Sequence, residues 1–394
     1  MDTGSQSWHP LIQLPWTYLR RAPVAVLLAV SILLIITAVF LLYTLLVIAA
    51  PIPRESRPGE KAFRTVLRNG KVSGPKQLPC WIDRWKAAKQ LTFSEPTIPG
   101  HAPRPKIDDA ELLLSVVVPA YNEEKRLGVM LDEAVSFLRS KSDGSAGWSK
   151  STEAVQGWEI LVVSDGSTDK TEDKAIAFAR ERGLIEDQGA ETKDGSSGTY
   201  GRGCLRVISL EHNRGKGGAV VHGMRHVRGQ YIVFADADGA SQFSDIAGLL
   251  KACQAAEDEH GRAVAIGSRA HLVGSEVVVK RSMLRNFLMH SFHLLLWILT
   301  PPATASIKDT QCGFKLFSRA SLPDIVPFMH SEGWIFDVEM LMLAESARVP
   351  MVEVPIGWKE VPGSKLNVVW ASLGMAWGLA VLRCAWALGV YKRK

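Results

Sequence analysis

Tyr231-Ile232-Val233-Phe234-Ala235-Asp236-Ala237-Asp238-Gly239 is the stretch that decides the fold class of this chain. Its apolar residues predict a buried strand, and two carboxylates one residue apart follow the end of that strand. In an open α/β sheet, ligands bind outside the carboxyl ends of the strands. Carboxylate oxygens there suit Mg²⁺ or Mn²⁺, which usually also bind oxygens of substrate phosphates. The alternative is a plain acidic turn, because Asp and Gly are ordinary turn residues.

Three further units of strand, loop and helix precede this stretch, and another strand follows it. Buried strands are predicted at 112–118, 159–163, 205–210 and 264–269. The first two end in polar loops, Tyr121-Asn122-Glu123 and Asp165-Gly166-Ser167, and the third runs into a glycine-rich turn at 213–219. Strands that alternate with helices predict an α/β fold with a doubly wound, mostly parallel sheet. The acidic loops are therefore expected at one edge of that sheet, where a cation or a sugar nucleotide would offset their repulsion.

Residues 24–50 carry no charged side chain and predict an N-terminal transmembrane helix, because about 20 apolar residues span a bilayer. A cleaved signal peptide is the alternative, although its apolar region is usually shorter, about 7–15 residues. The basic residues on the N-terminal side are Arg20 and Arg21, and those that follow the span are Arg54, Arg57, Lys61, Arg64, Arg68 and Lys71. Because positive charge stays on the cytoplasmic side, the long C-terminal part is expected to face the cytosol.

Charge and composition limit the kinds of partner, site and segment that the chain can have. The formal net charge of +6 is mild, and the basic residues form no single block, so no nucleic-acid partner is expected. The five cysteines form no CxxC pair and are odd in number, which favours free thiols over a disulfide framework or a zinc site. Residues 51–110 are rich in Pro, Lys and Arg and show no sustained period, which predicts a juxtamembrane linker.

Several motifs, taken together and in order, resemble those of the inverting glycosyltransferases of family 2, which have the GT-A fold. They are Val118-Pro119-Ala120-Tyr121-Asn122-Glu123, Ser164-Asp165-Gly166-Ser167-Thr168-Asp169, Asn213-Arg214-Gly215-Lys216-Gly217 and Asp236-Ala237-Asp238. Within that family, 309–315, 334–339 and the N-terminal apolar segment resemble the dolichyl-phosphate β-glucosyltransferases of the endoplasmic reticulum. The resemblance covers about 112–365. It implies transfer of glucose from UDP-glucose to dolichyl phosphate, by a single-pass protein of that membrane with its catalytic domain in the cytosol.

The same resemblance implies roles for single residues. The residues implied to hold the uridine nucleotide are Pro119, Tyr121, Glu123 and Asp165, with Lys216 at its end. Asp236 and Asp238 are implied to hold Mg²⁺ or Mn²⁺ on the pyrophosphate. The arginines implied to grip the acceptor phosphate are Arg269, Arg281 and Arg285. One position departs from the mannosyl relatives, because Ala240 stands where they place a polar side chain that contacts the metal.

Asp337 and Glu339 occupy the place where many relatives keep a catalytic base. An isoprenoid phosphate needs no strong base, since the second ionisation of a phosphomonoester lies near pH ~6 and the phosphate is already anionic at pH 7. We therefore expect Asp337 to orient neighbouring groups or the acceptor.

The resemblance also divides the chain. A short N-terminal segment (1–23), the transmembrane helix (24–50) and the linker (51–110) precede a nucleotide-sugar-binding core at 111–280. An acceptor-side part is expected at 281–365 and an apolar helix at 366–394, with membrane-interfacial helices in both. The alternatives for these apolar helices are core helices or a second membrane span.

Other functions remain open from the sequence. A dolichyl-phosphate mannosyltransferase that uses GDP-mannose is the near alternative. A processive polysaccharide synthase is disfavoured, because the chain lacks a QxxRW motif and has too few spanning segments. A membrane-tethered, non-catalytic module that binds nucleotide sugars is the distant alternative. The sequence leaves the oligomeric state undetermined.

Overall fold

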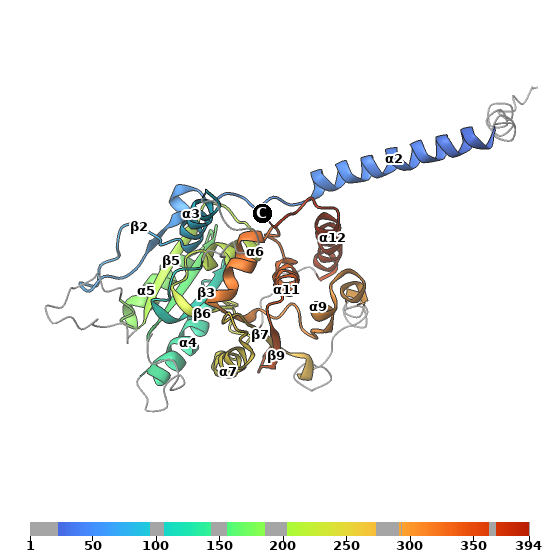
Figure 1. Ribbon diagram of the computed structural model, residues 1–394. Helices are drawn as coiled ribbons and strands as arrows, with labels where there is room; N and C mark the ends of the chain where they lie inside the picture. The colour runs from blue at the N-terminus through green and yellow to red at the C-terminus, as the bar shows by residue number, and fades with distance from the viewer. Residues whose placement is uncertain are drawn as a thin grey trace, which may run out of the picture. The chain divides into compact units, whose positions relative to one another are not determined.

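A computed structural model describes residues 23–94, 106–142, 156–185, 203–272, 291–292, 294–361 and 368–393. The chain divides into two compact units. One holds the N-terminal helix α2 (Val24–Ala49) and residues 384–392, and the other holds residues 51–383. In the second unit, helices surround a central sheet (Figure 1). Arg281 and Arg285 lie outside the described residues.

Nine strands of the described residues form one mixed sheet, in the order β2-β1-β5-β4-β3-β6-β8-β7-β9. Their bounds are β1 Ala62–Arg64, β2 Lys76–Gln77, β3 Leu112–Ala120, β4 Trp158–Asp165, β5 Cys204–Leu210, β6 Gly229–Ala235, β7 Val264–Ser268, β8 Phe314–Ser318 and β9 Met351–Pro355. The neighbouring strands β5, β4, β3 and β6 are parallel, which confirms the predicted doubly wound sheet. The chain leaves β3 towards β4 and β5 and then returns to place β6 on the other side of β3. Such a reversal of strand order opens a crevice at the carboxyl ends of the two strands.

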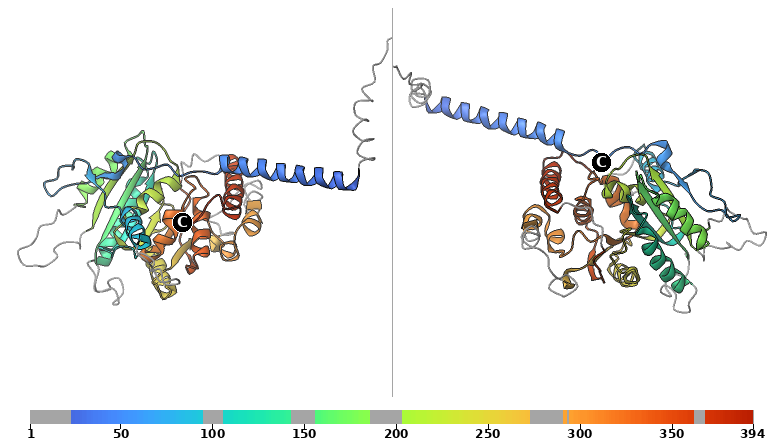
Figure 2. Two further views of the ribbon diagram at one scale, coloured as in Figure 1. Left: turned by 45° about the horizontal axis from the view of Figure 1, so that its top comes forward. Right: turned by 180° about the vertical axis from the view of Figure 1, so that it is seen from behind.

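Helices cover both faces of the sheet (Figure 2). The helices that follow α2 are α3 Trp81–Ser94, α4 Leu127–Ser142, α5 Thr171–Glu181, α6 Lys216–Met224, α7 Ile246–Ala256, α9 Pro302–Ser306, α10 Leu322–Ile325, α11 Phe336–Ser346 and α12 Val368–Ala387. On one face α4, α5 and α7 share a core with side chains such as Val116 and Val233. On the other, α6 packs its Gly223 against Val117, and α11 places the Phe336 ring 5.7 Å from that of Phe234. Neighbouring valines of β3 thus point to opposite helical layers, as a strand buried on both faces requires.

The strand β8 was not predicted from the sequence. It lies antiparallel between β6 and β7 and continues the sheet to β9. Its sequence Phe314-Lys315-Leu316-Phe317-Ser318 is short and carries a lysine, a residue that is almost never fully buried unless it is paired. Lys315 is nevertheless fully buried, because a carboxylate accompanies it in the interior.

The structure corrects the prediction of a linker at 51–110. Part of this segment forms β1, β2 and α3, and β1 pairs antiparallel with β5 at the edge of the sheet. Phe63, Val66 and Trp81 are buried, and the Trp81 indole N–H donates to the Met224 carbonyl at 2.7 Å. These apolar residues are too widely spaced to show a period, so the residue pattern contains no sign of their burial.

The helix α2 is long and apolar enough to cross a membrane, and no other helix of the described residues meets that test. The C-terminal part holds a second apolar helix, α12. It exposes Trp370 and Trp377, as a helix at a membrane interface does.

Candidate functional site

The carboxyl end of β6 carries the two predicted carboxylates. Asp236 and Asp238 are both partly exposed there, next to the point where the strand order reverses. Gly239 follows with a φ of +68°, and Asp238 Oδ1 accepts a hydrogen bond from the Ala240 N–H at 3.0 Å. Lys216, the first residue of α6, places its Nζ 2.6 Å from Asp236 Oδ1. The reversal of strand order thus brings the Lys216 ammonium group, at the start of α6, next to the Asp236 carboxylate that follows β6.

These carboxylates suit a divalent cation that arrives with a phosphate ligand. Among the residues described, no three His, Cys, Asp or Glu side chains gather into a metal cage. Mg²⁺ needs no such cage, because waters and substrate phosphates usually complete one or two carboxylates. Burial raises the pKa of nearby Glu123, Arg126 opposes that rise, and Asp238 and Asp236 add to it. The negative charge concentrated at this edge therefore fits a bound cation.

The backbone of Gly313 lies directly against Asp236, and an added Cβ would collide with its carboxylate. We expect Gly313→Ala to displace that carboxylate and lower kcat about 10²-fold, since a 1 Å misplacement costs about that much. Steady-state turnover at saturating donor and acceptor measures the effect. Gly128→Ala is the matched control, because an added Cβ there meets nothing within 4 Å. Equal turnover in the two variants would contradict the expected displacement.

The loops that leave β3 and β4 are tied together. Asn122, with a left-handed φ of 55°, accepts hydrogen bonds at its side-chain oxygen from the N–H groups of Thr168 (2.8 Å) and Asp169 (3.3 Å). Glu123 accepts two hydrogen bonds from the Arg126 guanidinium, at 2.7 and 2.5 Å. Tyr121 is about half exposed at this edge. Three of the predicted nucleotide-binding positions, Pro119, Tyr121 and Glu123, thus lie on or beside one braced loop.

Asp165 is buried at the end of β4. Its Oδ1 accepts a hydrogen bond from the Arg214 backbone N–H at 2.7 Å. Burial raises the pKa of Asp165 to about 6, although the backbone N–H groups of Arg214 and Gly215 oppose that rise. This carboxylate therefore fixes the position of the loop that leads into α6 and Lys216.

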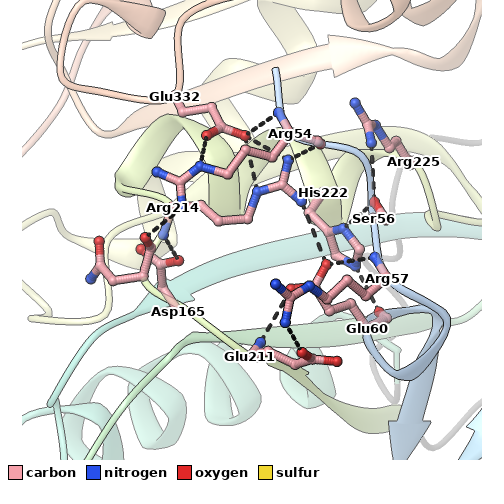
Figure 3. A network of polar contacts seen from close by, with 11 residues as sticks. Arg54, Ser56, Arg57, Glu60, Asp165, Glu211, Arg214, His222, Arg225 and Glu332 are labelled. Atoms are coloured by element: carbon pink, nitrogen blue, oxygen red, sulfur yellow. Dashed lines mark hydrogen bonds and ion pairs between the residues drawn. The ribbon is translucent and has the colours of Figure 1, made fainter. Parts of the chain in front are cut away.

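The Arg214 side chain joins that loop to the segment that follows α2 in sequence (Figure 3). Arg214 Nε donates to Glu332 Oε1 at 2.9 Å, and its Nη2 donates to the Arg54 carbonyl. The Arg54 backbone N–H donates to the same Glu332 oxygen at 3.2 Å. Glu60 Oε2 lies 3.7 Å from Arg214 Nη1. Residues 54–60 therefore form part of the support beneath Asp165.

We expect Glu332→Gln to weaken UDP binding about tenfold, or about 1.4 kcal/mol. The substitution loosens the Arg214 loop but leaves Asp236 and Asp238 unchanged. Calorimetric titration of UDP into the full-length protein measures the dissociation constant. Glu172→Gln is the control, since Glu172 pairs with Arg64 outside this network. Equal dissociation constants for the two variants would show that the network does not reach the nucleotide.

Asp337 lies in the first turn of α11 and is buried. It pairs with Lys315 Nζ, which also donates to the Cys312 carbonyl at 2.7 Å. Burial raises the pKa of Asp337 against the attraction of Lys315. Glu339 is also buried, and it accepts hydrogen bonds from the backbone N–H groups of 330–331. Both carboxylates thus have an ion-pair or hydrogen-bond partner in the protein interior.

Arg269 follows β7 and makes a two-point ion pair with Asp309. Its Nε lies 2.7 Å from Asp309 Oδ2, and its Nη2 lies 2.8 Å from Oδ1. The guanidinium carbon is 5.8 Å from the centre of a Trp358 ring. These contacts fix the guanidinium: partial burial lowers the pKa of Arg269, but Asp309 raises it by more.

Sequence reasoning missed four side chains around the site: Arg126, Asp309, Lys315 and Glu332. Arg126 could have been found as a helical i, i+3 partner of Glu123. Asp309 and Lys315 lie within a motif that carries the family resemblance, but their partners are far away in sequence. Glu332 gave no signal, because its role depends on a fold that brings 54, 214 and 332 together.

Comparisons with known proteins place the chain among glycosyltransferases. The family model of glycosyl transferase family 2 matches residues 115–325. The dolichyl-phosphate β-glucosyltransferase of Saccharomyces cerevisiae is 45% identical over 291 residues, which cover 72% of this chain and 78% of that protein. The Homo sapiens protein of the same name is 39% identical, over 71% of this chain and 77% of its own length.

A similar solved structure is glucosyl-3-phosphoglycerate synthase from Mycobacterium tuberculosis in complex with uridine diphosphate. It matches with a TM-score of 0.46 and 19% identity, over 70% of this chain and 80% of that one.

Proposed function

Because the chain belongs to the dolichyl-phosphate β-glucosyltransferases of glycosyl transferase family 2, we propose that it transfers glucose from UDP-glucose to dolichyl phosphate with inversion. The products are UDP and dolichyl β-D-glucosyl phosphate, a glucose donor for the assembly of lipid-linked oligosaccharide in N-glycosylation. One observation carries the proposal for this site. Asp236 and Asp238 follow the end of β6 beside the reversal of strand order, with Lys216 Nζ 2.6 Å from Asp236.

The leaving-group side of the reaction lies at these carboxylates. Asp236 and Asp238 would hold Mg²⁺ or Mn²⁺, and Ala240 offers no side-chain ligand, so water and pyrophosphate oxygens would complete the coordination. When bound, the ion offsets the negative charge of the departing UDP. Lys216 adds a positive charge beside Asp236. Pro119, Tyr121, Glu123 and Asp165 would hold the uridine nucleotide.

The acceptor side needs a grip on a phosphate and no strong base. A phosphate monoester is already anionic near pH 7, because its second ionisation lies near pH ~6. Asp309 already accepts hydrogen bonds from Nε and Nη2 of Arg269, so this fixed guanidinium would bind a phosphate oxygen through its remaining N–H groups, and Arg281 and Arg285 are proposed to assist it. Asp337, buried against Lys315, fits a role in positioning.

The proposed location is the endoplasmic reticulum membrane, with α2 as the single span and the catalytic domain in the cytosol. The length and hydropathy of α2 support the anchor, and the basic residues after it support the orientation. Within the cytosolic part, 111–280 would bind the nucleotide sugar and 281–365 would face the lipid acceptor. The exposed tryptophans of α12 support contact of residues 366–394 with the membrane interface.

The test is an assay of the purified full-length protein with dolichyl phosphate and one donor at a time: UDP-glucose, UDP-galactose or GDP-mannose. Each is run with Mn²⁺, with Mg²⁺ and with neither. We expect lipid-linked sugar from UDP-glucose alone, and only with a divalent ion. Transfer from GDP-mannose would establish the mannosyl alternative. Binding of UDP-glucose without any turnover would establish a non-catalytic binding module.

A further inference from the structure

A cavity of about 550 Å³ lies between the segment that follows α2 in sequence, the 330–335 loop and α12. Its apolar lining includes Ile52, Trp334, Ile335, Trp370, Gly374 and Gly378. The positions 370, 374 and 378 recur every four residues and so lie along one face of α12. The volume falls within the range of about 300–1,000 Å³ that is usual for small-molecule sites.

The lining is apolar and open. Ile52 is 83% exposed, Trp370 is 72% exposed and Trp334 is 46% exposed. A Cβ added at Gly374 would meet nothing within 4 Å, so that part of the α12 face borders empty space. The polar side of the cavity carries two arginines and one carboxylate, because Arg54 and Arg214 both contact Glu332. The cavity therefore offers large apolar surfaces beside a polar edge with one excess positive charge.

The cavity adjoins the candidate active site. The Trp334 ring centre is 5.9 Å from Lys216 Nζ, and the same Nζ lies 2.6 Å from Asp236 Oδ1. On the α12 side, Gln311 Nε2 donates to Met375 Sδ at 2.7 Å. Gln311 precedes by two residues the Gly313 backbone that abuts Asp236. An occupant of the cavity thus has one end within reach of the proposed leaving-group site.

We propose that this cavity holds the first isoprene units of the lipid acceptor, an inference that rests on the proposed transfer to dolichyl phosphate. The occupant must be apolar, because it covers the exposed tryptophans and the glycine face of α12. It must also extend a reacting group towards Asp236, because Trp334 lines the cavity and lies next to Lys216, the partner of Asp236. A polyisoprenyl phosphate meets both conditions, whereas a water-soluble acceptor meets only the second.

A photoreactive phytanyl phosphate with a diazirine in its first isoprene unit tests the site in the full-length protein. After irradiation in detergent micelles, peptide mapping is expected to find the label in 51–54, 333–335 and 370–378. Labelling confined to other segments overturns the proposal. This readout requires no turnover, so it is separate from a failure of the proposed function, which would appear as no glucose transfer by the same preparation.

Gly374→Leu fills the open part of the cavity. We expect about tenfold less label in the three segments and about a tenfold higher KM for dolichyl phosphate, because the new side chain takes the place of chain methylenes. The dissociation constant of UDP stays at the wild-type value. Leu373→Trp is the control, since it adds bulk on the same helix outside the lining.

If Gly374→Leu fails to fold, as lost UDP binding would show, Gly374→Ala replaces it with an expected effect of about threefold, for about one methyl group. Wild-type labelling and KM in the folded variant overturn the proposal.

Discussion

An Asp238→Asn variant is expected to lose about 10³-fold or more in kcat for glucose transfer. A metal ion that neutralises a leaving group stabilises the transition state by several kcal/mol. Each 1.36 kcal/mol corresponds to a factor of about ten in rate. Asparagine keeps the shape of the side chain and its oxygen for the Ala240 N–H but removes the charge. Because no strong base is required for a phosphate acceptor, most of the catalysis depends on this charge. Single-turnover rates at saturating substrates measure the loss.

Asp132→Asn is the matched control for this prediction. Asp132 lies on α4 and pairs with Arg182 on the protein surface, so its charge is remote from the strand ends. Its neutralisation is expected to leave kcat within about twofold, as exposed pairs contribute about 0–1 kcal/mol. A loss in Asp238→Asn no larger than that of the control would rule out a leaving-group role for Asp238.

Asp337→Asn is expected to affect stability more than turnover. The substitution leaves Lys315 charged and buried without its carboxylate, and breaking such a pair costs about 3–5 kcal/mol. The Tm of the full-length protein, followed by circular dichroism in detergent, should fall accordingly. The kcat of the folded fraction is expected to fall only about tenfold, through misplacement of Lys315 and its neighbours.

A paired substitution separates these two effects. Lys315→Met combined with Asp337→Leu removes both charges, and we expect it to recover most of the lost Tm, because apolar replacements of a buried pair are often neutral. If Asp337→Asn instead loses as much kcat as Asp238→Asn at an unchanged Tm, Asp337 is the catalytic base and the positioning role is wrong.

The central part of the fold could be predicted because its signals are local. The strand β6, which precedes Asp236, and the three strands parallel to it are mostly apolar, and α4 follows a helical period. The apolar residues that recur at helical spacing along α4, among them Leu127, Leu131 and Leu138, are all buried. Since the carboxyl ends of parallel strands meet at one edge, the order of strands and loops along the chain was enough to expect the acidic loops there.

The remaining features depend on pairs that are distant in sequence. β1 joins the sheet through Phe63 and Arg64, and nothing in 51–110 marks that pairing. Lys315 looks like a polar interruption until Asp337 is placed beside it. Arg54, Arg214 and Glu332 meet only because the chain returns twice to the end of β4. A single sequence carries no periodic signal for contacts of this kind.

The dependence of UDP affinity on Mn²⁺ tests the central claim most directly, that Asp236 and Asp238 hold the ion on the pyrophosphate. Calorimetry with the full-length wild type is compared with a variant carrying both Asp236→Asn and Asp238→Asn. We predict that Mn²⁺ tightens UDP binding at least about tenfold in the wild type, equal to about 1.4 kcal/mol, and has no effect in the variant. The same Mn²⁺ effect in both proteins would contradict the assignment of these two carboxylates.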